Sequence, residues 1–246
     1  MGYIPSCDHR EDAIRSLAEI YVVSTEEIGR VLEASEVLEI AQEYSEMGSQ
    51  YFHFVVCHLL QASPRSDITH ACYYHSTSYD GRPSWFDDGL LGSSPGVVRF
   101  LEKMIEWLPL EEQVFAKEAV KGIVKRRSEY EGATAETCGP YAWNTFTAAS
   151  SSENGVRYRV PEAIQDLRSS SLCGVGGLVD LRGLIEEKLR PVVVKFKGTI
   201  SNIDDYCATL WAYLLSDDGE CHLTHTFTGD GQTIPKEDIL ALMDVS

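Results

Sequence analysis

Long apolar runs are missing from this sequence, and so are paired cysteines. No apolar stretch approaches the ~20 residues that a membrane-spanning helix needs, so we expect no membrane association. The seven cysteines are odd in number and scattered, and none shows the Cys-x-x-Cys spacing of a zinc site. The sequence therefore predicts reduced, buried thiols in place of a disulfide framework, and no metal centre.

Positive charge is also scarce. The 21 lysines and arginines are outnumbered by 38 aspartates and glutamates, which gives a net charge of −17. Such a surface repels phosphate backbones, so a protein partner is favoured over nucleic acid. The same charge supports one alternative function, an acidic binding or inhibitor protein of the immunity type that masks a basic partner.

A cleaved secretory signal is not expected at the N-terminus. Asp8, Glu11 and Asp12 stand where such a signal would be basic and then apolar. The sequence thus predicts a cytoplasmic protein, or one delivered into a host cell without a cleaved signal peptide.

Helical patterns dominate the first sixty residues. Apolar side chains at helical spacing and a Ser-x-x-Glu capping box predict helices over 11–22, 24–32 and 36–47. The nearly continuous apolar segment 51–60 indicates a buried helix or strand, in which we interpret His53 and His58 as core histidines. We predict a helical N-terminal subdomain over residues 1–63.

The remaining residues, 64–246, mix short strands with helices and loops, which indicates an α+β domain of catalytic type. Alternating or β-branched segments predict strands over 71–79, 156–160, 192–197 and 220–227. Helices are predicted over 95–108, 110–129, 178–189, 203–215 and 235–242.

Cysteine and histidine chemistry supplies a second alternative. His222 and His225 lie three apart on a predicted strand and so point to opposite faces, which disfavours a shared metal. Cys72 and His75 point apart for the same reason. Cys138 with a distant histidine keeps open a Cys/His hydrolase, because catalytic partners need not be adjacent in sequence.

The segment Ala71-Cys-Tyr-Tyr-His-Ser-Thr-Ser-Tyr79 is the most informative stretch of the chain. Its tyrosines and threonine favour extended backbone, and Asp80-Gly81 with Pro83 ends it in a turn. We therefore predict that His75 lies near the end of a short strand, with three hydroxyls leading into a loop.

Two other polar residues occupy comparable positions. Tyr141 follows Gly139 in a glycine-marked loop, and Glu220 follows a turn and precedes a predicted strand. With His75, these motifs resemble the His–Tyr–Glu branch of the ADP-ribosyltransferase superfamily, which includes diphtheria toxin and the poly-ADP-ribose polymerases. The first segment is similar to the branch's Tyr-His-Gly-Thr-Ser, with Ser76 in place of glycine.

The resemblance implies an ADP-ribosyltransferase-like split β-sheet core and a transferase of the glycosyltransferase class. An effector or toxin of this kind would transfer ADP-ribose from NAD to a macromolecular acceptor and release nicotinamide, with no metal. NAD cleavage passes through an oxocarbenium-like ribose, and a carboxylate placed against that ribose stabilises the transition state. This is the role implied for Glu220.

The resemblance also implies how NAD would be bound. His75 would hydrogen-bond the adenosine-side ribose, and Ser76 or Thr77 would help to hold the carboxamide. The ring of Tyr141 would stack on the flat nicotinamide. Because the protein is acidic, any pyrophosphate site must be made locally, by backbone N–H groups or by an arginine such as Arg82.

Overall fold

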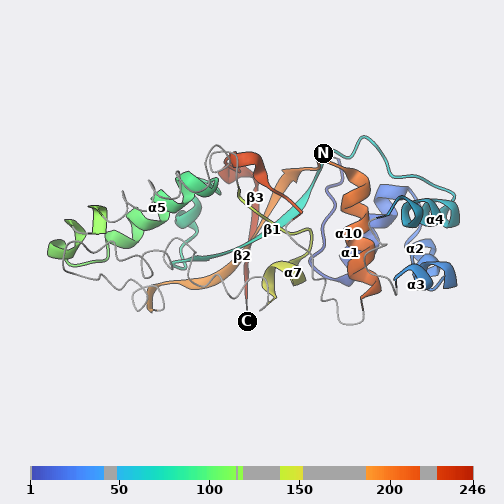
Figure 1. The fold of residues 1–246 in the computed structure, drawn as a ribbon, viewed down its shortest axis with the longest axis horizontal. Helices are drawn as coiled ribbons and strands as arrows, with labels where there is room; N and C mark the ends of the chain where they lie inside the picture. Colours follow the sequence, from blue (N-terminus) through green and yellow to red (C-terminus); the bar gives the residue numbers. More distant parts are fainter. Residues whose placement is uncertain are drawn as a thin grey trace. The chain divides into compact units, whose positions relative to one another are not determined.

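The structure is a computed structural model that describes residues 2–41, 49–114, 116–118, 139–151, 187–216 and 226–245. Within these residues the chain forms helices and a three-stranded antiparallel sheet with the order β1-β2-β3 (Figure 1). The protein is therefore mixed α+β, as predicted. No helix in this described part is long and apolar enough to cross a membrane.

The chain divides into two compact units, each made of segments that are distant in sequence. Unit 1 comprises 1–74, 142–151 and 195–227, and unit 2 comprises 75–141, 152–194 and 228–246. Both units use parts of β1 and β2. The predicted boundary between 1–63 and 64–246 stays a prediction.

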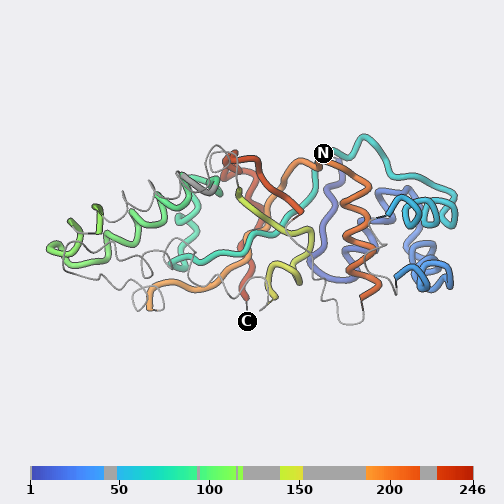
Figure 2. Tube along the Cα trace, viewed as in Figure 1, coloured from blue at the N-terminus to red at the C-terminus, as the bar shows by residue number. Residues whose placement is uncertain are grey.

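Unit 1 is mainly helical. Its helices are α1 (Arg10–Tyr21), α2 (Thr25–Leu32), α3 (Ser35–Ala41), α4 (Gln50–Leu60), α7 (Phe146–Ser150) and α10 (Ile203–Leu215). Helix α1 lies beside α10, although residues 22–202 separate them in the sequence (Figure 2). Where the two helices pack, the rings of Tyr21 on α1 and Trp211 on α10 make an edge-to-face contact with their centroids 6.5 Å apart.

The predicted capping box at the start of α2 is confirmed. The Ser24 hydroxyl accepts a hydrogen bond from the Glu27 backbone N–H, and the Glu27 carboxylate accepts one from the Ser24 N–H at 2.9 Å. These bonds satisfy backbone donors that the first helical turn leaves unpaired. Local sequence therefore determines this helix start.

Helix α4 is buried on one face only. Phe52, Val56 and Leu60 lie in the core, whereas Phe54 is exposed. The prediction of a core histidine is wrong for His58, which is exposed and stacks on the Phe54 ring. Successive helical residues point in different directions, so a continuous apolar run is buried all round only where protein surrounds the helix.

The sheet contains two long strands, β1 (His70–Tyr79) and β2 (Arg190–Thr199), and the shorter β3 (Ile239–Asp244). The predicted strands at 71–79 and 192–197 are confirmed. The register of β1 and β2 follows from one bond at the start of β1, where the Ile200 N–H donates to the Thr69 carbonyl. At the other end the Arg190 guanidinium donates to the Tyr79 hydroxyl at 2.6 Å.

Unit 2 contains the rest of the sheet, the 3₁₀ turns η2 (Pro83–Phe86), η5 (Gly229–Gly231) and η6 (Lys236–Asp238), and helix α5 (Ser93–Ile105). Helix α5 confirms the helix predicted at 95–108, and residues 110–114 and 116–118 are also helical. The helix predicted over 235–242 is wrong, because η6 and β3 occupy those residues. The short run Ile-Leu-Ala-Leu fits either state by pattern, and pairing within the sheet decides for strand.

Several predicted elements lie wholly or mainly outside the described residues, namely the strands at 156–160 and 220–227 and the helix at 178–189. The predicted helix at 203–215 is confirmed as α10. Cys7, Cys57, Cys72 and Cys207 are reduced cysteines, and all but Cys57 are buried.

Candidate functional site

His75 is the sixth residue of the ten-residue strand β1 and is half-buried. The prediction that it lies near the end of a short strand is wrong. The strand continues through Ser76, Thr77 and Ser78, because β2 extends far enough to pair with them. The imidazole is thus held on rigid backbone in the middle of a sheet strand.

Tyr141 meets His75 across 66 residues of sequence. The Nδ1 atom of His75 lies 2.7 Å from the main-chain oxygen of Tyr141. A carbonyl oxygen only accepts, so Nδ1 carries the proton of this bond. In the neutral ring the acceptor lone pair is then on Nε2.

Strand-like pairing fixes the segment that contains Tyr141. Tyr74 and Trp143 exchange backbone hydrogen bonds of 2.9 and 3.0 Å in an antiparallel bridge. Tyr74 directly precedes His75, and Trp143 lies two residues after Tyr141. This antiparallel pairing therefore places His75 next to Tyr141. Both side chains are half-buried.

Glycines allow a close backbone approach on the other side of Tyr141. The Gly231 N–H donates to the Gly139 carbonyl at 2.9 Å. A Cβ on Gly229 would lie 2.6 Å from that same oxygen, closer than a side chain tolerates. Since Gly139 and Gly229 both have positive φ, only residues without a side chain fit this crossing easily.

The other predicted NAD-binding residues are distributed along β1 and its turn. Ser76 and Thr77 are half-buried in the strand, and Thr77 is on the same face as His75. Arg82 lies beyond the end of the strand. The strand residues from His75 to Tyr79 alone span about 13 Å at the usual rise per residue, so Arg82 lies far from His75 along the strand. The structure therefore brings His75 and Tyr141 together and leaves Arg82 at the strand end, while Glu220 lies outside the described residues.

Arg82 is engaged with Asp80. Its backbone N–H donates to Asp80 Oδ1 at 2.9 Å and its Nε to Oδ2 at 2.7 Å. The Asp80 side chain is only 8% exposed, whereas that of Arg82 is 71% exposed. Burial by itself would raise the pKa of Asp80, but the bonds from Arg82 outweigh it and the pKa is lowered.

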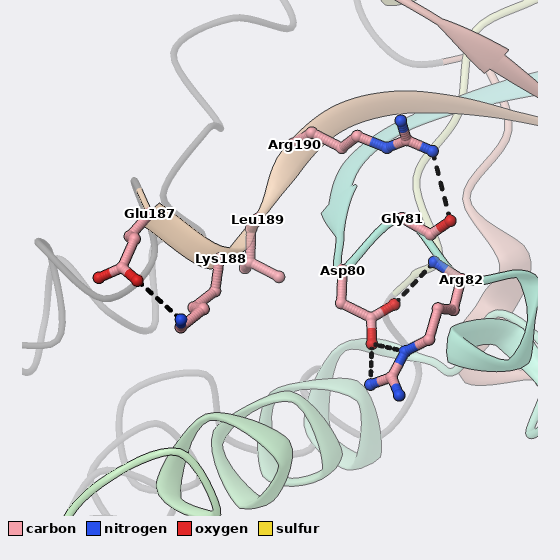
Figure 3. A pocket seen from close by; sticks show the side chains of 7 residues that line it. All are labelled: Asp80, Gly81, Arg82, Glu187, Lys188, Leu189 and Arg190. Atoms are coloured by element: carbon pink, nitrogen blue, oxygen red, sulfur yellow. Dashed lines mark hydrogen bonds and ion pairs between the residues drawn. The ribbon is translucent and has the colours of Figure 1, made fainter.

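A cavity of about 320 Å³ lies where β1 ends and β2 begins (Figure 3). Its lining residues come from the two strand ends: Asp80, Gly81, Arg82, Glu187, Lys188, Leu189 and Arg190. Sequence reasoning identified Arg82 but missed Arg190. Only the antiparallel register of β1 and β2 brings Arg190 to the Asp80-Gly81 turn, and that register cannot be read from either segment alone.

A second polar cluster missed from sequence joins the N-terminal segment to the sheet within unit 1. Asp8 accepts hydrogen bonds from Lys195 Nζ at 2.7 Å and from the Tyr74 hydroxyl at 2.6 Å. Burial opposes ionisation of Asp8, but the bonds from Lys195 and Tyr74 outweigh it and lower the pKa of the carboxyl group. Asp8 is therefore a stably charged acceptor.

Cysteine chemistry receives no support from the described thiols. Cys57 Sγ lies 3.4 Å from His53 Nε2, but burial raises the pKa of this thiol and keeps it protonated. Burial likewise raises the pKa of Cys72 to about 11. Cys138, His222 and His225 lie outside the described residues. Among those that are described, no group of three or more His, Cys, Asp or Glu side chains could hold a metal ion.

In comparisons with known proteins, the chain matches no protein-family model, no curated protein and no solved structure. The resemblance to the ADP-ribosyltransferases therefore stays a prediction. Of its three motif residues, the structure describes His75 and Tyr141, and Glu220 lies outside the described residues.

Proposed function

We propose that this chain is a mono-ADP-ribosyltransferase of effector or toxin type, which transfers ADP-ribose from NAD to a protein acceptor. Its fold would be the ADP-ribosyltransferase-like split β-sheet core with added N-terminal helices. One observation supports the proposal: the imidazole Nδ1 of His75 lies 2.7 Å from the main-chain oxygen of Tyr141, 66 residues away in the sequence. A His–Tyr–Glu site requires these two residues to lie on one NAD-binding surface.

Each of the two residues has a role that fits its position. The strand and the Tyr141 carbonyl orient the imidazole of His75, and its ring would bind the adenosine-side ribose. The Tyr141 ring would stack on nicotinamide, which is flat and aromatic. Rigid placement of binding groups limits the entropy lost when a ligand binds.

The transfer itself needs a carboxylate and no metal. A nucleophile on the acceptor would attack C1′ of the nicotinamide ribose while the C1′–N bond breaks and its electron pair neutralises the pyridinium ring. The nucleophile's proton would leave to solvent. Glu220 would stabilise the positive charge that develops on the ribose, an interaction that is strongest in the transition state.

Nicotinamide release from NAD tests the proposal. We expect Glu220→Ala to reduce release about a hundredfold or more, the scale of losing an electrostatic transition-state contact. Tyr141→Ala would reduce it as well, by weakening nicotinamide binding. The matched controls are Tyr51→Ala on α4 and Glu39→Ala on α3, two exposed residues that should leave release unchanged.

The experiment also separates the alternatives. No release by the wild-type protein, together with tight and salt-sensitive binding to a basic protein, would favour the acidic inhibitor. Hydrolysis of an ester or amide that is lost only in Cys138→Ala would favour the Cys/His hydrolase. Either result would overturn the transferase.

A further inference from the structure

The cavity at the end of β1 and the start of β2 is lined by more positive than negative side chains. Arg82, Lys188 and Arg190 contribute three cations, and Asp80 and Glu187 contribute two carboxylates. This local excess occurs in a protein whose net charge is −17. The net charge of the lining is thus positive, whereas that of the whole chain is negative.

Two of the three cations are paired with carboxylates. Arg82 donates to Asp80 through both its backbone and its guanidinium, and Lys188 lies 2.7 Å from Glu187 (Figure 3). The pair of Lys188 and Glu187 is exposed, so little free energy holds it and Lys188 can turn to another anion. The pair of Arg82 and Asp80 is held by more bonds and is the more fixed of the two.

Arg190 keeps its charge without a carboxylate partner in the described part of the chain. Its Nη2 donates to the Tyr79 hydroxyl at 2.6 Å and to the Gly81 carbonyl at 3.3 Å, and both acceptors are neutral. The guanidinium also lies 4.8 Å from the centre of the Tyr79 ring. Because these contacts use one nitrogen, the donors on Nε and Nη1 stay available for a ligand.

Gly81 makes this position of Arg190 possible. A Cβ built on Gly81 would lie 3.3 Å from Arg190 Nε, and the residue has a φ of +86°. A side chain here would therefore crowd the guanidinium and strain the turn. The turn and the arginine together form a fixed cation on the cavity wall.

We propose that this cavity is a phosphate-binding site, in which Arg190 holds the oxygens of a phosphate or pyrophosphate group and Lys188, which is directed to Glu187 in Figure 3, turns to contact the same group. A guanidinium offers parallel N–H donors that match two oxygens of a phosphate, and a lysine adds a mobile point charge. The site goes beyond ADP-ribosyl transfer and does not depend on it. Within the cavity, Arg190 is the proposed phosphate ligand in place of Arg82, because Asp80 already neutralises the charge of Arg82.

Calorimetric titration with inorganic pyrophosphate at constant ionic strength tests the site. We expect saturable binding of one pyrophosphate per chain, weakened at least about tenfold in Arg190→Gln through loss of charged hydrogen bonds. Lys188→Gln should weaken binding by a smaller factor, because Lys188 must leave Glu187 to reach the ligand whereas Arg190 is already held in place. Glu187→Gln should tighten binding, since it removes a negative charge from the cavity and releases Lys188.

Arg30→Gln on α2 is the matched control. It changes the net charge by the same amount as Lys188→Gln from an exposed position outside the cavity lining, so its affinity for pyrophosphate should equal that of the wild type. If Arg190→Gln does not fold, the affinities of the other two variants still test the site, because Lys188→Gln should weaken pyrophosphate binding and Glu187→Gln should tighten it. Non-saturable heats, or equal affinities in all four variants, would overturn the site.

Competition with ADP-ribose identifies the source of the phosphate. Displacement of bound pyrophosphate by ADP-ribose would assign the site to the pyrophosphate of a dinucleotide. Retained pyrophosphate in excess ADP-ribose would assign it to a phosphate group on another molecule. Nicotinamide release is measured separately, so failure of the transferase and failure of the phosphate site give different results.

Discussion

The imidazole Nδ1 of His75 lies 2.7 Å from the main-chain oxygen of Tyr141. This bond joins a side chain in the middle of a sheet strand to the backbone of a glycine-flanked segment. The ring of His75 therefore has two separable tasks: its Nδ1 side holds the segment in place, and its Nε2 side is the part proposed to meet the ribose of NAD.

Two substitutions at His75 should separate these tasks. Asparagine can place its amide N–H near the position of Nδ1 and keep the bond to the Tyr141 carbonyl, but it has no counterpart of Nε2. We expect His75→Ala to lower the free energy of unfolding by about 1 kcal/mol, the usual net value of one hydrogen bond, and His75→Asn to lower it less. Urea denaturation measures both.

Nicotinamide release in the same variants gives the second readout. It should fall in both His75→Ala and His75→Asn, because neither retains a group at Nε2. Wild-type release by a well-folded His75→Asn protein would contradict a role for the ring in binding NAD.

Features governed by neighbouring residues could be predicted from the sequence. The capping box of Ser24 and Glu27, strand β1 and helix α10 all follow from local signals, namely a cap, β-branched or aromatic residues, and helical spacing. The choice of His75 and Tyr141 as partners also came from the sequence, through a resemblance to a known family.

Features governed by pairing between distant segments could not be predicted. Residues 239–244 have an apolar composition that suits a helix, yet they pair as β3. The hydroxyl-rich residues 76–78 suggest a loop after His75, yet they continue β1 because β2 extends to Arg190 and pairs with them. The arrival of Arg190 at the Asp80-Gly81 turn depends on that same register.

The ion pair of Asp8 and Lys195 should be important for stability. Their side chains are only 27% and 14% exposed, and removing one partner leaves the other charge poorly compensated. We expect Asp8→Asn to lower the free energy of unfolding by about 2 kcal/mol, because charged hydrogen bonds from Lys195 and Tyr74 are weakened. Asp67→Asn, which breaks an exposed pair with Arg65, is the control and should cost less.

The same carboxyl group should give stability a defined pH dependence. Its pKa is lower in the folded protein than usual, so the folded state binds its proton less readily than the unfolded state. The contribution of Asp8 is full above the ordinary aspartate pKa of about 3.9 and is lost as the pH falls through the lowered value. Unfolding curves of wild type and Asp8→Asn should therefore converge in acid; a constant difference down to the lowest pH would contradict this assignment.

Two buried tyrosines should respond in opposite directions to loss of the hydroxyl. The Tyr206 hydroxyl is buried and has no hydrogen-bond partner among the residues that the structure describes, so Tyr206→Phe removes an uncompensated polar group. The Tyr74 hydroxyl donates to Asp8 and accepts from the Cys7 N–H at 2.8 Å, so Tyr74→Phe leaves Asp8 with the bond from Lys195 alone and takes this acceptor from the buried Cys7 N–H. We expect Tyr206→Phe to be neutral or stabilising by about 1 kcal/mol and Tyr74→Phe to be destabilising by about 2 kcal/mol. Thermal denaturation of the two variants measures the difference, and a marked loss of stability in Tyr206→Phe would show that its hydroxyl is satisfied.

Two glycines allow a similar comparison of backbone constraints. Gly89 has a φ of +79°, and a Cβ there would lie 2.2 Å from the Ile234 carbonyl oxygen, at the point where Leu90 and Ile234 pair. Gly29 lies within helix α2, and a Cβ there would have nothing within 4 Å. Gly89→Ala should therefore destabilise the protein by more than about 2 kcal/mol, because a left-handed conformation and a backbone clash add up. Gly29→Ala should stabilise it by up to about 1 kcal/mol through better helix propensity. Chemical denaturation of both variants tests the pair, and equal effects would mean that the turn at Gly89 can shift to accommodate a side chain.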